Sequence, residues 1–311
     1  MKVLLAVDGS EYSRASVALM KRLSMPKDCE VIVVTVLGTG ASFGGDGFGV
    51  LDTEIAALES YREDALVESR RMLSAIADEL GEAGWTVRTR TEHGHTADRI
   101  VATANELGVD HIVVGSHGMT GFDRFLLGSV SRAVVTHAPC SVLVVRKPAD
   151  TQDAGTRELI SRRADSGHPL RILAAFDGSP SARAAIELLR TLPLRADSEL
   201  TVVTVLTVAT TLYGKDILQR LSTSWQEHSR AAQLELESVL ARLKQATPNV
   251  FTKLIDDGTD ASPDILRLAT DLEVDIVVLG STGTSAIERF LLGSVTARVL
   301  DHAPCSVWVV R

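Results

Sequence analysis

The sequence predicts an α/β protein built from two tandem copies of one open parallel sheet, each covered by helices on both faces. The chain has 311 residues, about twice a typical domain of roughly 150 residues. It also repeats itself: residues 3–10 (VLLAVDGS) return as 172–179 (ILAAFDGS), and 23 of the 38 residues in 109–146 are identical to those in 274–311. Within each copy, short apolar runs alternate with stretches of helical periodicity, the pattern of strands and crossover helices in a parallel sheet.

The repeat divides the chain into a first domain (residues 1–146), a linker (147–168) and a second domain (169–311). The linker contains Pro148 and Gly155 among mixed charges, a composition typical of a surface connection. Basic and acidic side chains number 14 and 19 in the first domain and 14 and 17 in the second, which gives net charges of −5 and −3. Neither domain has the cationic face that duplex nucleic acid requires, so we expect no nucleic-acid partner.

Composition also bears on the compartment. The longest apolar run, residues 31–37, is far shorter than the roughly 20 residues that cross a bilayer, so we expect no membrane span. Asp8 interrupts the apolar run 3–7 before it could form the core of a signal peptide. The three cysteines form no Cys-x-x-Cys pair and are too few for a disulfide framework. These features predict a cytoplasmic protein with reduced thiols.

The first strand and helix follow from the opening residues. The continuous apolar run 3–7 predicts a strand buried on both faces. Ser10 is suited to cap a helix that runs to Leu23. A second apolar run, 31–37, predicts the next strand. The glycine-rich segment 38–49 that follows predicts a mobile loop, which makes this part of the first copy longer than in the second.

The remaining elements alternate in the same way. Apolar residues recur at helical spacing over 53–83, and Gly84 ends that helix. A third strand is expected at 86–91. The elements expected after it are a helix at 97–107, a strand at 111–114, a glycine-bearing loop, a helix at 129–136 and a strand at 142–145. The second copy repeats each element.

The loop after the fourth strand carries the functional signal. It reads GSHGMTGFDRFLLGS over 115–129 and GSTGTSAIERFLLGS over 280–294, so both copies have the spacing Gly-x2-Gly-x9-Gly-Ser. Glycines let the backbone approach a ligand closely, and the amides of the helix that follows favour a phosphate. Asp8 and Asp177 end the first strand of each copy, where a carboxylate could bind a ribose hydroxyl or a metal held by phosphates.

Two other phosphate-binding patterns are missing. A Walker loop would place a lysine directly before the serine, but Gly128 and Gly293 stand there. The dinucleotide fingerprint is also absent after the first strand. Plain turn glycines are the alternative reading, which the duplication at constant spacing disfavours.

These motifs, together with the closing His-Ala-Pro-Cys-Ser-Val segment in both copies, resemble the universal stress protein family in its tandem two-domain form. The loop spacing is similar to that of the branch that binds ATP. The resemblance implies a five-stranded Rossmann-like sheet, of the adenine nucleotide α-hydrolase type, in the order 3-2-1-4-5. It implies ATP, with Mg²⁺ as an option, as the cofactor, and Asp8 and Val36 at the ribose and adenine. The phosphates would be held by Gly115, Gly118, Gly128, Ser129, Val130 and Ser131. The second copy would use Asp177, Val205, Gly280, Gly283, Gly293, Ser294, Val295 and Thr296.

Several other residues allow alternative readings. The pairs His137/Cys140 and His302/Cys305 could suggest zinc, but each lacks a further ligand pair and a structural turn is the better interpretation. His93, His95, His111 and His117 cluster in the first copy only, which disfavours a metal site, although His117 could touch a phosphate. Arg124 and Arg289 recur in both loops and could reach a phosphate, a partner or only solvent.

The functional hypothesis is a nucleotide-dependent regulatory module in stress response that contacts an unidentified regulatory protein. The alternative is an enzyme that slowly hydrolyses ATP or transfers its phosphate, for which the sequence shows no positioned base or charge clamp. An interaction scaffold with empty sites is a third reading. The closing strands, 142–145 and 307–310, are strongly apolar for edge strands, so we expect them to pair about a pseudo-twofold axis. Further pairing of chains into a homodimer is also expected.

Overall fold

The computed structural model describes residues 1–23, 26, 28–38, 52–118, 127–147, 168–207, 215–245, 247–258, 260–283 and 292–311. In the first half the chain forms β1 (Lys2–Ala6), α1 (Glu11–Arg22), β2 (Glu30–Leu37), α2 (Asp52–Glu82), β3 (Thr86–His93), α3 (Thr96–Leu107), β4 (His111–Gly115), α4 (Ser129–His137) and β5 (Ser141–Val145). The second half repeats them as β6 (Arg171–Ala175), α6 (Pro180–Thr191), β7 (Glu199–Thr207), α7 (Lys215–Leu243), β8 (Val250–Gly258), α8 (Ala261–Asp271), β9 (Ile276–Gly280), α9 (Ser294–His302) and β10 (Ser306–Val310). The α/β class and the doubled unit are therefore confirmed.

Local sequence explains where the elements begin and end. The Ser10 hydroxyl accepts a hydrogen bond from the backbone N–H of Ser13 and so caps α1, and Ser179 caps α6 in the same way. Gly108 ends α3 in the left-handed conformation, with φ of 56°. Every expected element lies within two residues of its observed bounds. The segments 38–49 and 147–168, interpreted as a loop and a linker, lie almost wholly outside the described residues.

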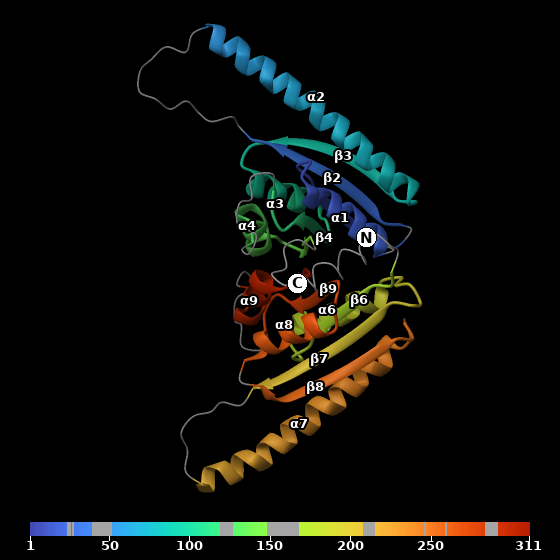
Figure 1. Ribbon diagram of the computed structural model, residues 1–311, viewed down its shortest axis with the longest axis vertical. Coiled ribbons are helices and arrows are strands. Elements are labelled where there is room, and N and C mark those ends of the chain that lie inside the picture. The colour runs from blue at the N-terminus through green and yellow to red at the C-terminus, as the bar shows by residue number, and fades with distance from the viewer. Residues whose placement is uncertain are drawn as a thin grey trace.

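All ten strands form one sheet in the order β3-β2-β1-β4-β5-β10-β9-β6-β7-β8, so each half has the expected order 3-2-1-4-5. Neighbouring strands within a half are parallel, whereas β5 and β10 are antiparallel. Their register places Leu143 opposite Trp308, with one further pair on either side. The closing strands thus meet about a pseudo-twofold axis, as the apolar edges predicted, and each buries the other's open edge. Figure 1 shows the result, with α2 and α7 at the two ends of the molecule.

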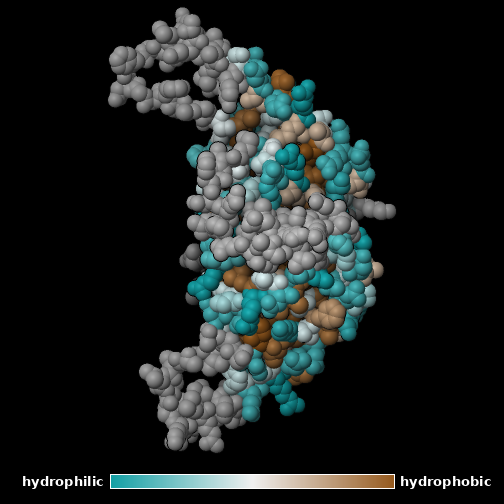
Figure 2. Space-filling model, viewed as in Figure 1, coloured by the Kyte–Doolittle hydropathy of each residue, from teal (hydrophilic) through white to brown (hydrophobic). Residues whose placement is uncertain are grey.

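Helices cover both faces of the sheet. One core cluster joins the sheet to α1, α2, α6 and α7, and the other joins it to α3, α4, α8 and α9. Strands β1, β4, β5, β9 and β10 are buried on both sides, which accounts for their unbroken Val, Leu and Ile runs. Outside this core, the exposed large apolar side chains among the described residues include Leu234 and Phe251, and apolar surface gathers over the β8 and α7 region in Figure 2.

Polar contacts join the two halves beyond the shared sheet. The buried Arg146 guanidinium donates to the carbonyls of Leu300 and Asp301 in the last turn of α9, at 2.8 and 3.1 Å. Arg311 donates in the same way to carbonyls of the last turn of α4. Cations suit these positions because the helix dipole makes the C-terminus negative.

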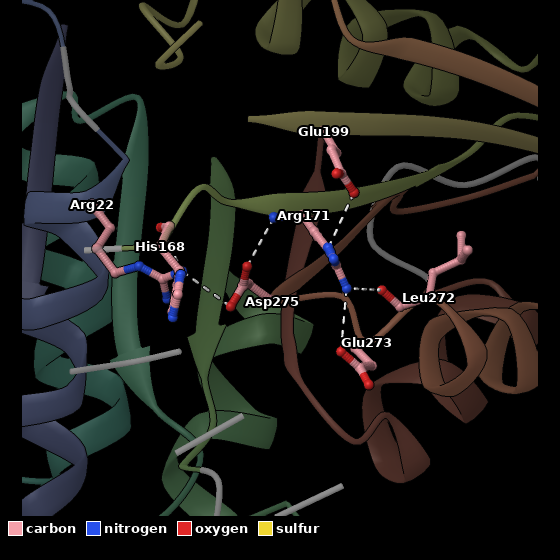
Figure 3. A network of polar contacts seen from close by, with 7 residues as sticks. All are labelled: Arg22, His168, Arg171, Glu199, Leu272, Glu273 and Asp275. Atoms are coloured by element: carbon pink, nitrogen blue, oxygen red, sulfur yellow. Dashed lines mark hydrogen bonds and ion pairs between the residues drawn. The ribbon is translucent and has the colours of Figure 1, made fainter. Parts of the chain in front are cut away.

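A second contact is not repeated by the pseudo-symmetry. Arg22, the last residue of α1, pairs with the buried carboxylate of Asp275 at 3.2 Å and also reaches the carbonyl of His168 (Figure 3). The other carboxylate oxygen of Asp275 accepts the backbone N–H of Arg171 at 2.8 Å. This network fixes α1 of the first half to the start of β6 and β9 in the second.

Candidate functional site

The sequence motifs meet at the carboxyl ends of β1 and β4. These strands are neighbours, but the chain leaves β1 toward the face covered by α1 and leaves β4 toward the face covered by α4. Such a change of direction opens a crevice at the ends of the strands, which is where ligands bind in open α/β sheets. Strands β6 and β9 form the same switch point in the second half. Each half therefore has one candidate site.

Asp8 lies at this switch point and is held by donors from α1. One carboxylate oxygen, Oδ1, accepts the backbone N–H of Ser10 at 3.0 Å and the hydroxyl of Ser13 at 2.7 Å. The Ser13 hydroxyl also accepts the backbone N–H of Asp8 at 2.9 Å. The other oxygen, Oδ2, faces Gly118 of the loop. Sequence reasoning missed Ser13, and its place on the first turn of the helix that follows Asp8 is the signal that could have found it.

The three motif glycines of the first half lie where the backbone is crowded. A Cβ at Gly115 would come 2.5 Å from Cβ of Tyr12, and one at Gly118 would come 2.8 Å from Oδ2 of Asp8. A Cβ at Gly128 would lie 3.0 Å from the carbonyl oxygen of Ser116. Glycine at 115 is needed to pack the end of β4 against α1. Glycine at 118 brings the loop onto the aspartate, so the first two motif glycines serve different contacts.

Helix α4 begins at this crevice without a side-chain cap. Its N-cap residue, Gly128, has no side chain to accept from the first-turn amides, whereas Ser10 supplies such an acceptor for α1. Ser129 is exposed and Val130 is half-buried. The first amides of a helix have no partner within the helix and attract anions. An oxygen-rich anion at this end would replace the missing cap.

The hydroxyl of Ser131, expected near the phosphates, points elsewhere. It is buried and donates to the carbonyl oxygen of Gly115 at 2.6 Å, which fixes α4 to the end of β4. Thr296 donates to Gly280 at 2.8 Å in the second half. Both hydroxyls therefore position the two ends of the loop, and only the backbone amides of these residues remain to meet a ligand.

The second half reproduces the arrangement with fewer contacts. Asp177 accepts the backbone N–H of Ser179 at 3.0 Å, and its Oδ2 lies 3.0 Å from where a Cβ at Gly283 would be. Ala182 stands in the place of Ser13, so no hydroxyl holds this carboxylate from that position. Helix α9 begins without a side-chain cap at Gly293, followed by Ser294 and Val295, in the same way as α4.

Val36 and Val205 take equivalent places on the second strand of each half. Both lie near the carboxyl end of their strand, are half-buried, and pack on the core cluster that contains α4 and α9. Val130 and Val295 pack on the same cluster. The four valines are therefore partly exposed on the face of the sheet that α4 and α9 cover.

Three other histidines have structural contacts. His137 and His302 each approach the carbonyl oxygen four residues earlier, at 2.9 Å, which fits the turn interpretation. His111 is buried in β4, its ring 5.4 Å from that of Trp308. In the part of the chain that the structure describes, no three His, Cys, Asp or Glu side chains gather in a way that could hold a metal ion. Arg124 and Arg289 lie outside that part.

Comparison with known proteins identifies relatives of both halves. The model of the universal stress protein family matches residues 1–146 and 170–311. A universal stress protein of Mycolicibacterium smegmatis is 27% identical over 310 residues, covering 99% of this chain and 96% of the relative. A putative universal stress protein of Staphylococcus haemolyticus is 34% identical over 155 residues, which are 49% of this chain and 87% of that protein.

Solved structures agree on the fold. The crystal structure of a universal stress protein from Archaeoglobus fulgidus covers 100% of this chain and 98% of its own, with a TM-score of 0.61 and 20% sequence identity. In the described part of the chain no helix is long and apolar enough to cross a membrane.

Proposed function

The chain belongs to the universal stress protein family, and we propose that it binds ATP in each half and acts as a nucleotide-dependent regulatory module in stress response. One observation carries this proposal. At the same point of both halves, a carboxylate faces a loop glycine beside a helix that begins without a capping side chain. That arrangement offers an acceptor for sugar hydroxyls and a row of amide donors for phosphate oxygens.

Each group has a distinct role in the bound nucleotide. Asp8 and Asp177 accept ribose hydroxyls, and Val36 and Val205 line the adenine. The amides around Gly118 and Gly283, and those that open α4 and α9, hold the phosphates. Mg²⁺ bound with ATP would neutralise phosphate charge, and the same two aspartates are the motif carboxylates available to it. Because each half carries a net negative charge, the anion is held by local amides and not by bulk charge.

The hydrogen bonds that Asp8 already makes favour a regulatory role over a catalytic one. Hydrolysis or phosphate transfer needs a base aimed at the attacking group, and one oxygen of Asp8 is already engaged by Ser10 and Ser13. ATP turnover above background that is abolished by Asp8→Ala and Asp177→Ala together would reverse this preference.

Nucleotide binding is tested first by calorimetry with ATP and Mg²⁺ and by mass spectrometry of nucleotide released from the purified, denatured protein. We expect two sites per chain. If millimolar ATP produces no binding heat and no thermal stabilisation, the proposal is refuted.

Glycine variants assign the binding to the loops. Gly118→Ala and Gly283→Ala each place a Cβ 2.8 or 3.0 Å from the facing aspartate, so each is expected to weaken its own site about tenfold or more. Gly81→Ala is the matched control, because a Cβ there meets nothing within 4 Å. If ATP binds the loop variants as well as the control, the loops do not hold the ligand.

Assembly and location complete the proposal. We expect a homodimer, which a solution mass of one 33.3 kDa chain at micromolar concentration would refute. The regulatory partner protein is part of the same proposal, and so is a cytoplasmic location, which three cysteines without disulfides favour. The domain division at residues 1–146 and 169–311 predicts that limited proteolysis cuts first within 147–168.

A further inference from the structure

His117 distinguishes the loop of the first half from that of the second. The residue is 7% exposed. One ring nitrogen, Nδ1, lies 3.1 Å from the hydroxyl of Ser116, and the other, Nε2, is buried without a hydrogen-bond partner among the described residues. Buried polar atoms are normally paired, because leaving one unpaired forfeits its interaction with water. This nitrogen therefore needs an explanation.

The ring lies where the phosphates are expected. A Cβ at Gly128, the residue before α4, would come 3.4 Å from Cα of His117 and 3.9 Å from its Cδ2, the ring carbon bonded to Nε2. The Tyr12 ring packs against the imidazole with centroids 5.2 Å apart. Packing against Gly128 and Tyr12 thus places the Nε2 edge of the imidazole beside the uncapped start of α4.

The contact with Ser116 suits a donor at Nε2. When the serine hydroxyl donates to Nδ1, a neutral imidazole carries its proton on Nε2. An N–H at that position can donate to an anion bound by the first amides of α4. The same bound anion would then accept hydrogen bonds from Nε2 of His117 and from the first amides of α4.

The second half lacks this group. Thr282 replaces His117, and Ser181 replaces Tyr12. The carbonyl oxygen of Thr282 accepts hydroxyl hydrogen bonds from Ser181 at 2.5 Å and Ser179 at 3.3 Å. This loop is tied to α6 through its backbone and presents no imidazole to the start of α9.

We propose that the two sites are unequal, because Nε2 of His117 donates a hydrogen bond to a phosphate oxygen of the nucleotide in the first half only. The first half then binds ATP more tightly than the second, whereas adenosine, which has no phosphate, gains nothing from His117. This inference rests on the proposed nucleotide binding and adds a specificity-determining residue to it.

The test compares ATP with adenosine in full-length chains whose second site is weakened by Gly283→Ala. His117→Thr, which installs the residue of the second half, is expected to lower ATP affinity about tenfold, typical for a hydrogen bond to a charged group, and to leave adenosine affinity within about twofold. His117→Gln keeps an N–H donor and is expected to retain most of the ATP affinity. Thr282→Ala, in a chain whose first site is weakened by Gly118→Ala, is the matched control and should leave ATP affinity within about twofold.

The outcomes separate this inference from the function on which it rests. If the wild type binds no ATP, the proposed function fails. If it binds ATP and His117→Thr leaves that affinity unchanged, only the role of His117 fails. An equal loss of ATP and adenosine affinity would show that the imidazole merely packs the loop, and a His117→Gln variant as weak as His117→Thr would exclude the donor role.

Discussion

The ion pair between Arg22 and Asp275 predicts that the halves are coupled in stability, with a strength that can be measured. The two side chains are 15% and 6% exposed, and their closest atoms lie 3.2 Å apart (Figure 3). Asp275 also accepts the backbone N–H of Arg171 at 2.8 Å. Asp275→Ala therefore removes the acceptor of two donors, one of them a guanidinium that is largely buried.

The repeat supplies a matched control for this change. Asp110 occupies the equivalent position in the first half and accepts the backbone N–H of Lys2 at 2.8 Å, but it is exposed. Removing one partner of a buried ion pair costs about 3–5 kcal/mol, whereas losing an ordinary hydrogen bond costs about 1 kcal/mol. We expect Asp275→Ala to lower the free energy of unfolding by about 3–5 kcal/mol and Asp110→Ala by about 1 kcal/mol. The difference between these two losses measures the contribution of the contact between Arg22 and Asp275, which joins the halves.

Urea unfolding followed by circular dichroism measures these free energies. A double-mutant cycle with Arg22→Met isolates the pairwise energy, which should be about 2 kcal/mol or more for a contact shielded from solvent. Equal losses for Asp275→Ala and Asp110→Ala, or a coupling energy near zero, would show that solvent screens the pair and that it does not couple the stability of the halves.

Three further predictions concern titratable groups. Burial lowers the pKa of His111 to about 4, so between pH 6.5 and 4 the unfolded chain takes up a proton that the folded chain does not. The free energy of unfolding should therefore fall by about 3 kcal/mol as pH drops over this range. His111→Ile should remove this pH-dependent loss when unfolding is measured as a function of pH. Burial alone would raise the pKa of Glu92, but hydrogen bonds from Arg99 and Arg90 outweigh it and lower the pKa. Its stabilisation is present above the ordinary carboxyl pKa and lost as pH falls through the lowered value, so Glu92→Gln should flatten the acid limb of the same curve. Burial raises the pKa of the Cys29 thiol to about 11, so a thiol reagent at pH 7.5 should label it only after unfolding, and rapid labelling of the native protein would contradict its burial.

The fold could be predicted from the sequence because its signals are local and occur twice. Apolar runs such as 3–7 and 31–37 identify strands buried on both faces, and Ser10 and Gly84 mark helix ends close to where the chain places them. The strand order came from the family resemblance, since periodicity alone gives no order. The pairing of β5 with β10 followed from their apolar character, because an uncovered edge of that kind would aggregate.

The candidate site was predictable in outline but not in its contacts. Glycine spacing identified the loop, yet it gave no reason to expect that Gly118 faces Asp8 or that Ser13 holds the carboxylate. The approach of Gly118 to Asp8 depends on how β1 and β4 lie side by side, although they are more than 100 residues apart in sequence. The contact of Ser13 is local, because only five residues separate it from Asp8, but glycine spacing carries no information about it. The unpaired nitrogen of His117 is likewise invisible in sequence, because only packing shows which polar atoms are buried without partners.

The asymmetry of the central contact explains why two similar halves pair with each other. Trp308 lies opposite Leu143 on the pseudo-twofold axis, so two first halves would oppose leucines and leave space, and two second halves would oppose tryptophans and overfill it. Arg132 pairs with Asp301 across the same contact, although Ala297 and Thr136 stand at the equivalent positions. Like halves would therefore lose this ion pair in either combination. A large side chain against a smaller one, and a cation against an anion, favour the pairing of a first half with a second half over the pairing of two like halves.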